Sequence, residues 1–523
     1  MAEPNAPSDD PAVSRRIGRR ELLGGALAAG SVAVAYAALG DRLSIFGSSD
    51  DETVAAEAEA ISQESVQINH LLRRTGFGTT REEYDRYQAM GLSATLDAVL
   101  NYGGVDDSIA EGMAAQFTFD ATTRGLPAVW WLVRMANTRR PLQEKMTLFW
   151  HSLLTSQISE VRDPEAMVAQ NEFFRAHAMD RFPDILKGIS KDPAMMTYLD
   201  IDGSNRRAPN ENYARELMEL FALGVGNYTE TDVREAARAF TGWNVPRERI
   251  NPGAFTLKEP VFRQQAYDSG TKTFLGQTGN FGPDEIVDII TKQPASAEYI
   301  VRRLFGFFVF PDPTADDLKP FVEVYQRNDM RIGPVVEAML RSDVFYSPKA
   351  YRAIVKSPTE YAIGAVKALG LQTQLTQLLN QQGQRGQNAS ALASMGQVLF
   401  EPPNVAGWPG GTSWLNSATI FARLNFLNGL TSGEAASPPA QRPNDGARRQ
   451  PPPTPTPSTT QAGLGTAGDA LRHYLPFVID DLLPGEARQV LVDYARGDAS
   501  ELSAEQLRGL VYLVLGSPQF HLS

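Results

Sequence analysis

Apolar residues recur at helical spacing over most of this chain, and that periodicity constrains the fold more than any other feature. Start signals for helices are frequent along the same stretches. In three of them a Ser or Thr is followed three residues later by a side chain that can complete a capping box, at 229–232, 357–360 and 503–506. Pro358 occupies the first helical position of the second box, where proline is favoured. The pattern predicts a chain dominated by helices.

Alternation of apolar and polar residues, which is typical of strands, is scarce. The best candidates are two short segments, 254–257 and 273–275, enough for a hairpin but too little for a domain built on a sheet. The sequence therefore predicts a mainly α fold, a multi-helix globular domain with at most a small β-hairpin.

The composition narrows the classes of protein and site. A chain of 523 residues with 42% hydrophobic content can bury an extensive core without covalent staples. It contains no cysteine, which excludes disulfides, thiolate zinc sites, iron–sulfur ligation and cysteine nucleophiles. The 61 acidic and 49 basic residues give a formal charge of −12. We therefore expect no nucleic-acid partner, because such proteins carry a basic binding surface.

Residues 1–40 have the layout of a bacterial export signal. The arginine pair Arg19-Arg20 is followed by an acidic residue and two leucines, which resembles the twin-arginine motif. The apolar stretch after it, 22–39, is rich in Ala and Gly and only mildly hydrophobic. A stop-transfer helix would need about 20 strongly apolar residues. The segment therefore predicts export by the twin-arginine route.

A cleavage pattern follows in the same segment. Ala35 and Ala37 form a small-x-small motif, which predicts that the mature chain begins near Ala38. We expect the twin-arginine translocase to carry the folded protein to the periplasm, the cell surface or the medium. An uncleaved membrane anchor and a plain helix are the alternatives for this segment.

Composition divides the chain into five parts. After the signal and a spacer rich in acidic residues and Ala, helical periodicity is interrupted by one Pro/Thr/Gln-rich stretch. Such a stretch cannot bury enough apolar surface to offset the entropy of ordering. The predicted parts are the signal (1–40), the spacer (41–65), a main helical domain (66–431), a disordered insertion (432–468) and C-terminal helices that pack on the main domain (469–523).

Six segments of the chain have long and specific motifs in a fixed order. They read HLLRRTGFG (70–78), FWH (149–151), APNENYARELMELF (208–221), REAARAFTGW (234–243), KTFLG (272–276) and PPNVAGWPGG (402–411). Together they resemble the landmarks of one bacterial family, the domain of unknown function 1800 family (DUF1800). The resemblance runs from about Ile68 to the C-terminus, apart from the Pro/Thr-rich stretch.

The resemblance implies an exported, mostly helical protein. Members are commonly encoded beside a second exported family that is similar to the alkaline phosphatase and sulfatase superfamily, so the resemblance implies such a companion as partner. It carries over no reaction. Where members often have histidines, this chain has Tyr267 before Asp268 and Gln293 before Pro294. These departures argue against metal ligation at those positions.

The segment 211–223 predicts a helix with one polar and one apolar face. Two carboxylates one turn apart, a guanidinium and an amide could line a pocket that binds a hard cation or performs acid–base chemistry. A solvated face with internal ion pairs is the alternative. Glu216 and Glu219 are the candidate catalytic residues, and the same pair with Asp200 are the candidate ligands of a divalent cation. The candidate binding residues are Asn210, Asn212 and Arg215. Asn210 is also the expected N-cap of the helix.

His151 is the third candidate catalytic residue. Its predicted helix places it with Glu144 and Thr147, on the side opposite Met146 and Trp150. A lone histidine in such a place is either an acid–base catalyst or a residue held by structural hydrogen bonds. None of the five histidines lies four residues from another. A site of several histidines would therefore need long-range convergence.

The loop at 404–414 combines three glycines with two tryptophans, Trp408 and Trp414. Such aromatic residues can stack on sugar rings, or they can pack a tight, buried turn against helices. Both tryptophans are candidate binding residues. His70 and Arg73, in the first family-like segment, are two more.

Two hypotheses about function follow. One is a binding or assembly protein that accompanies another exported protein at the cell surface and has no chemistry of its own. The other is an extracytoplasmic hydrolase, with a divalent cation as its possible cofactor, that acts on a surface polymer through Glu216, Glu219 and His151. The chain has no complete catalytic motif, which favours the first. Convergence of the candidates in one concave pocket would favour the second.

Overall fold

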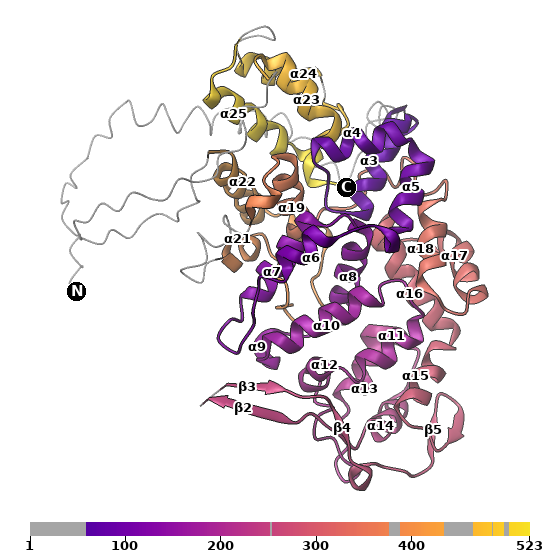
Figure 1. Ribbon diagram of the computed structural model, residues 1–523. Coiled ribbons are helices and arrows are strands. Elements are labelled where there is room, and N and C mark those ends of the chain that lie inside the picture. Colours follow the sequence, from indigo (N-terminus) through magenta and orange to yellow (C-terminus); the bar gives the residue numbers. More distant parts are fainter. Residues whose placement is uncertain (1–58, 252–253, 376–387, 433–463, 484, 496–500) are drawn as a thin grey trace, which may run out of the picture.

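The computed structural model of the protein describes residues 59–251, 254–375, 388–432, 464–483, 485–495 and 501–523. Over these residues the fold is mainly helical, as predicted, and the strands form only two-stranded pairs (Figure 1). The predicted signal, and all but the end of the predicted spacer, lie outside the described residues. None of the described helices is long and apolar enough to cross a membrane.

The N-terminal half consists of helices joined by short connections. They are α3 (Glu64–Thr75), α4 (Arg81–Met90), α5 (Leu92–Leu100), η2 (Tyr102–Gly104), α6 (Ser108–Ala114), α7 (Leu126–Asn137), α8 (Pro141–Leu153), α9 (Ile158–Val161), α10 (Pro164–Ala176), α11 (Phe182–Ile189), α12 (Pro193–Tyr198), α13 (Asn212–Glu216), the π-helical turn η3 (Leu217–Ala222) and α14 (Glu230–Ala239).

The strands follow α14, and helices then complete the chain. The strand region contains β1 (Trp243–Asn244), β2 (Arg247–Asn251), β3 (Ala254–Leu257), β4 (Val261–Phe262), η4 (Gln264–Ala266), β5 (Lys272–Phe274) and β6 (Gln277–Gly279). The later helices are α15 (Pro283–Thr291), α16 (Pro294–Phe308), α17 (Ala315–Arg327), α18 (Ile332–Leu340), α19 (Pro358–Ala368), η5 (Gln372–Gln374), α21 (Asn388–Ser394), η6 (Gly411–Trp414), α22 (Ser417–Ser432), α23 (Ala467–Ile479), α24 (Gly485–Tyr494), α25 (Ala504–Leu515) and η7 (Pro518–His521).

The three predicted capping boxes are present. Thr229, Ser357 and Ser503 each accept a hydrogen bond from the backbone N–H three residues on, where the side chain bonds back to the cap. Pro358 lies in the first turn of α19, as predicted. These local bonds satisfy N–H groups that the helix itself leaves free. The local sequence therefore determines where these helices begin.

Two apolar cores stabilise the molecule, and α8 contributes to both. Met146 and Trp150 belong to the first core, with α3, α5 and the helices from α11 to α18. Leu148 belongs to the second, with α7, α19, α22 and the C-terminal helices. Because both sides of α8 are covered, polar residues such as Glu144 and His151 are buried as well. The side of α8 that carries them packs against α7, α10 and the loop around Phe400.

Three donors compensate for the burial of Glu144. The indole Nε1 of Trp131 donates to Oε2 at 2.8 Å. Arg134 and Arg175 donate to Oε1 at 2.9 and 2.5 Å. Burial alone would raise the pKa of Glu144, but the charges of Arg175 and Arg134 outweigh burial and lower it. A buried carboxylate is tolerated when it is paired and hydrogen-bonded in this way.

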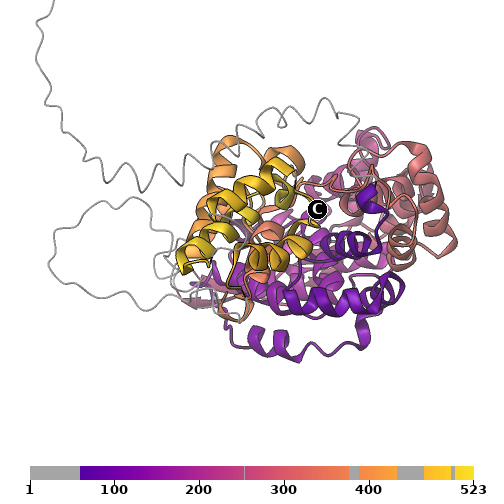
Figure 2. The same ribbon diagram turned by 90° about the horizontal axis from the view of Figure 1, so that it is seen from above.

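The C-terminal helices pack against N-terminal ones. Figures 1 and 2 show α23 to α25 beside α22 and α4. Asp480, directly after α23, accepts hydrogen bonds at 2.8 Å from both Arg73 and Asn69 of α3. The hydroxyl of Tyr351 donates to the same carboxylate at 2.6 Å. One buried carboxylate thus joins three distant segments of the chain.

Helix α23 begins inside the segment predicted to be disordered, 432–468. Thr466 and Asp469 form a capping box, and Ala467 is buried at the start of the helix. The N–H of Leu502 also bonds to the carbonyl oxygen of Gly465 at 2.9 Å. These contacts explain why the end of that segment is helical. Most of the predicted insertion, 433–463, lies outside the described residues.

The strands form three antiparallel pairs, β1 with β4, β2 with β3 and β5 with β6. The predicted segment 254–257 is β3, and 273–275 overlaps β5. The fold class is as predicted, although the strands exceed a single hairpin. All of them lie between α14 and α15, at the end of the molecule opposite the C-terminal helices (Figure 1).

Candidate functional site

The polar face predicted for 211–223 is present, but the helix that carries it changes type. α13 ends at Glu216 and continues directly into the π-helical turn η3. There the N–H of Leu223 bonds to the carbonyl oxygen of Met218, five residues back, at 2.9 Å. The apolar side of this segment is buried, and the polar side chains remain at least partly exposed. Because π-helical turns occur frequently at functional sites, the segment is a candidate by geometry too.

The N-cap of this helix is one residue later than predicted. Glu211 occupies the cap position and makes no side-chain capping bond. The side chain of Asn210 accepts from the N–H of Asn212 at 2.9 Å, and the N–H of Asn210 donates to Ser204 Oγ at 3.0 Å. Asn210 therefore still satisfies an N–H of the first turn, because a short side-chain amide can reach the backbone two residues on.

The charged residues of the polar face pair with their neighbours. Arg215 forms ion pairs with Glu230 at 2.7 Å and with Glu211 at 3.4 Å. Glu219 accepts a hydrogen bond from the hydroxyl of Tyr228 at 2.7 Å. These contacts resemble the alternative anticipated from the sequence, a solvated face with internal ion pairs.

Asp200 and Asn212 lie together at the edge of this face. Asn212 Nδ2 donates to Asp200 Oδ2 at 2.9 Å, and both side chains are exposed. Asp200 has a positive φ of 56°, which Asp adopts more readily than most residues. Neither Glu216 nor Glu219 is among the described hydrogen-bond or ion-pair partners of Asp200. The predicted cation ligands are therefore not joined in one direct network.

His151 lies in the interior. Its Nε2 accepts a hydrogen bond from the backbone N–H of Phe400 at 3.0 Å. The imidazole also packs against the rings of Trp131, Phe400 and Trp408, with centroid distances of 5.1, 5.0 and 5.5 Å. The residue is 1% exposed, and burial lowers its pKa to about 3. This is the geometry of a structural histidine, which was the other alternative that the sequence left open.

His70 and Arg73 are also buried. His70 Nε2 bonds to the carbonyl oxygen of Phe345 at 2.9 Å, and Arg73 pairs with Asp480. His177 instead bonds to a neighbouring aspartate at the surface. The histidines considered for a shared site therefore have separate surroundings. His70 and Arg73 join elements of the fold and do not present an open binding surface.

The first part of the glycine and tryptophan loop, 404–414, packs against the end of α8 through Val405, Gly407 and Trp408. Gly407 has a φ of 81°, and a Cβ there would lie 2.5 Å from the carbonyl oxygen of Ser152. Trp408 and Trp414 are half-buried, while many of the residues between and around them are exposed. The packing predicted for this turn is found at Val405, Gly407 and Trp408, whereas residues 411–413 are exposed.

Acidic residues surround Tyr198, at the end of α12. Burial, followed by the negative charges of Glu160, Glu216 and Glu401, raises the pKa of Tyr198 to about 12. We call these four residues the Tyr198 cluster. Burial and the charge of Glu219 raise the pKa of Glu216. A carboxyl group with a raised pKa keeps its proton at a higher pH than usual, which is what a general acid requires.

The Tyr198 cluster gathers segments that are far apart in the sequence. Its acidic members come from α9, from α13 and from the loop that precedes Pro402. Glu401 accepts from the N–H and the hydroxyl of Ser159 at 3.1 and 2.5 Å, which fixes its position. Sequence reasoning found Glu216 but missed Tyr198, Glu160 and Glu401. No local pattern marks those three, because only the folded chain brings them together.

Within the residues that the structure describes, no group of three or more His, Asp or Glu has the arrangement of a metal site. Carboxylate oxygens are the ligands that hard cations prefer. Within the described chain, the predicted ligands Asp200, Glu216 and Glu219 do not form such a group.

Comparison with known proteins assigns the chain to a protein family. The sequence model of the family described as Protein of unknown function (DUF1800) matches residues 70–522. The chain belongs to the DUF1800 family. No curated protein and no solved structure matches it. The resemblance inferred from the six motifs is confirmed, and the family description names no reaction.

Several DUF1800 motifs contain residues whose hydrogen bonds connect separate elements of the fold. Glu235 of the REAARAFTGW motif accepts from the N–H of Thr273 in the KTFLG motif at 3.0 Å. Close to the FWH motif, Thr155 donates to the carbonyl oxygen of Val405 in the PPNVAGWPGG motif at 2.7 Å. The APNENYARELMELF motif differs because its polar face reaches solvent. For this DUF1800 protein, that face and the adjoining Tyr198 cluster form the candidate site.

Proposed function

We propose that this DUF1800 protein is exported by the twin-arginine route and works outside the cytoplasm as a binding partner of another exported protein. The observation that supports a binding role is the open surface of the strand region. Ile250 is 53% exposed, Val261 48% and Phe262 40%. The residues of β3 are only partly buried, and both residues of β4 are exposed. Three large apolar side chains of the strand region are thus exposed to solvent.

The strand pairs offer a partner more than apolar contact. A two-stranded pair is marginally stable alone in water, and each strand of such a pair has one edge whose N–H and C=O groups lack a strand neighbour. Proteins bind extended segments along edges of this kind, with apolar pockets adding specificity. Strand pairs that expose Ile250 on β2 and Val261 on β4 therefore suit a protein partner.

The partner we propose is an exported protein similar to alkaline phosphatases and sulfatases. The gene neighbourhood that the DUF1800 resemblance implies supports this choice. The strand region lies at the end of the molecule opposite α23 to α25 (Figure 1). Docking there would leave the C-terminal helices uncovered.

An affinity measurement with the purified companion tests this proposal. The double change Ile250→Ser and Val261→Ser should weaken binding at least about tenfold, because desolvated apolar contacts carry much of the energy of an interface. The matched control is Ile109→Ser with Val225→Ser, which alters two exposed apolar residues elsewhere. Wild-type affinity in the strand variant, or no binding by the wild type, would refute the proposed surface.

One observation favours a second function, an extracytoplasmic hydrolase that acts on a surface polymer. Glu216 combines partial burial and a raised pKa with two further carboxylates around Tyr198. Hydrolysis of glycosidic bonds uses a protonated and an ionised carboxyl group together. In this proposal Glu216 would be the acid and Glu401, held by Ser159, the second carboxyl group.

Release of soluble fragments from purified cell-envelope polysaccharide tests the hydrolase proposal. Glu216→Gln should abolish release, whereas Glu211→Gln, on the same polar face, should leave it nearly unchanged. A parallel assay with a chelator determines whether a divalent cation is needed. Equal activity of wild type and Glu216→Gln, or no release by the wild type, would rule out this role.

A further inference from the structure

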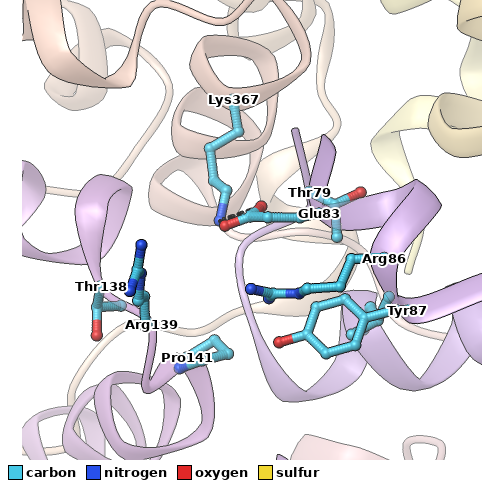
Figure 3. A pocket seen from close by; sticks show the side chains of 10 residues that line it. Thr79, Glu83, Arg86, Tyr87, Thr138, Arg139, Pro141 and Lys367 are labelled. Carbon is cyan, nitrogen blue, oxygen red and sulfur yellow. Dashed lines mark hydrogen bonds and ion pairs between the residues drawn. The ribbon is translucent and has the colours of Figure 1, made fainter. Parts of the chain in front are cut away.

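A pocket separate from the strand region and from the Tyr198 cluster lies between α4, the turn that precedes α8 and helix α19 (Figure 3). The space among its side chains, counted together with the solvent into which it opens, is about 300 Å³, and only a small part of that space is enclosed. The side chains that matter for its chemistry are those of Thr79, Glu83, Arg86, Tyr87, Arg139 and Lys367.

The pocket has more positive than negative charge. Its one carboxylate, Glu83, is already satisfied, because Lys367 donates to its two oxygens at 3.1 and 2.9 Å and the N–H of Thr80 donates at 2.8 Å. The guanidinium groups of Arg86 and Arg139 have no carboxylate partner among the described residues. Two guanidinium groups are therefore left for a ligand, in a chain whose formal charge is −12.

Neighbouring arginines are paired, which sets these two apart. Arg81, on the same helix as Arg86, forms an ion pair with Asp85 at 2.9 Å. Arg140, next to Arg139, lies 3.7 Å from Glu111. Arg86 and Arg139 are exposed and, unlike these two neighbours, form no ion pair within the described residues.

The walls of the pocket are held by other contacts. The guanidinium of Arg86 lies over the ring of Tyr87, 4.6 Å from its centroid, a favourable cation–π position. Asp107 accepts from the backbone N–H of Arg139 at 2.6 Å and from the hydroxyl of Thr138 at 2.8 Å, which fixes the turn. Figure 3 shows the guanidinium of Arg86 and the hydroxyl of Tyr87 directed from α4 towards the side that carries Arg139.

A close approach of two glycines positions α19, which forms the third wall of the pocket. Gly78 has a φ of 89°, and a Cβ there would lie 3.2 Å from the Cα of Gly364. The chain before α4 therefore packs tightly on α19, which brings Thr79 to the same pocket as Lys367. Thr79 and the hydroxyl of Tyr87 thus line the same pocket as the cationic groups.

We propose that this pocket binds a phosphate group through Arg86 and Arg139, with the hydroxyls of Thr79 and Tyr87 as further donors. Guanidinium groups match the geometry and charge of phosphate and bind it through paired hydrogen bonds. The ligand is either inorganic phosphate or a small phosphomonoester, which share the tetrahedral oxyanion. This inference is independent of the partner surface and of the Tyr198 cluster.

Isothermal titration calorimetry of the mature protein at constant ionic strength tests the inference. The probes are inorganic phosphate and glycerol 3-phosphate, with acetate as the non-phosphate anion. The wild type should bind at least one phosphate probe saturably. Arg86→Gln with Arg139→Gln should weaken that binding at least about tenfold, since each change removes hydrogen bonds to a charged group. The matched control, Arg124→Gln with Arg207→Gln, changes two exposed arginines elsewhere and should bind as the wild type does.

The two probes separate the two sources of phosphate. Equal affinity for both probes assigns the site to the free anion, and tighter binding of the ester assigns it to phosphomonoesters. Thr79→Val, which keeps the charge of the pocket, should weaken binding by a smaller factor and guards against misfolding of the double variant. No saturable binding of phosphate, equal binding of acetate, or undiminished binding by the Arg86 and Arg139 variant would overturn the inference.

Discussion

The imidazole Nε2 of His151 accepts a hydrogen bond of 3.0 Å from the backbone N–H of Phe400, a residue 249 positions further along the chain. The bond joins α8 to the loop that precedes the PPNVAGWPGG motif. Because both groups are buried, neither can form a hydrogen bond with water instead. The histidine that the sequence offers as a catalyst is in this protein an acceptor that connects two segments of the fold.

Removal of this acceptor should destabilise the protein. His151→Phe leaves the N–H of Phe400 buried without a partner, and we expect the free energy of unfolding to fall by about 1–3 kcal/mol. Urea unfolding followed by circular dichroism measures it. His151→Gln, whose side-chain carbonyl can accept the bond, should lose less. Equal stability of wild type and His151→Phe would contradict the structural role.

The same histidine should make stability depend on pH. Its pKa is about 3 in the folded protein and about 6.5 in an unfolded chain. Between those values the unfolded state binds a proton that the folded state does not. The stabilisation is complete above about pH 6.5 and is lost as the pH falls, by about 1.4 kcal/mol per pH unit for this group.

The comparison that isolates this effect is wild type against His151→Gln between pH 6 and pH 4. Other titrating groups are common to both proteins, so the difference between their slopes reports His151 alone. The variant should have the shallower slope. Parallel curves would mean that the imidazole already takes up its proton in the folded state.

Asp480 should be among the most sensitive positions of the fold. Burial alone would raise its pKa, but the charges of Arg73 and Arg352 outweigh burial and lower it far below its usual value. Asp480→Asn leaves both guanidinium groups buried without a carboxylate, and a broken buried pair typically costs about 3–5 kcal/mol. The thermal midpoint measures the loss. Asp85→Asn, at the exposed pair with Arg81, should cost less than about 1 kcal/mol.

How far the sequence predicts this structure depends on whether a feature is local. The capping boxes at Thr229, Ser357 and Ser503 and the strand at 254–257 follow from bonds between near neighbours, so their signals lie in short segments. The polar side of α8 could not be assigned from periodicity. A helix that contributes to two cores buries Glu144 and His151 as fully as its apolar residues.

The candidate site, too, is predicted from the sequence only where its features are local. The polar face that includes Glu216 has a helical period and was predicted. Tyr198 and Glu401 belong to the site because α12 and a distant loop meet beside that face. No sequence pattern within either segment predicts that contact. The π-helical turn after Glu216 likewise depends on packing and has no signal in helix propensity.

Stability should respond weakly to loss of charge on the polar face. Glu216→Gln with Glu219→Gln should change the free energy of unfolding by less than about 1 kcal/mol, because both side chains are partly exposed and exposed pairs contribute little. The thermal midpoints of wild type and double variant, each with and without a chelator, separate two cases. If a cation binds at this face, the chelator should lower only the wild-type midpoint. A large loss in the variant without chelator would mean that the face is structural.

Export should depend on one arginine pair and not on positive charge alone. We expect Arg19→Lys with Arg20→Lys to block appearance of the mature protein outside the cytoplasm, because the twin-arginine route recognises the paired arginines ahead of the apolar stretch. The change keeps the charge and is confined to the predicted signal, so the precursor should accumulate inside the cell. The matched control is Arg15→Lys with Arg16→Lys, which alters the other arginine pair of the signal and should be exported normally. Fractionation and immunoblotting of both variants measure the outcome, and normal export of the Arg19 and Arg20 variant would remove the basis for placing the protein on this route.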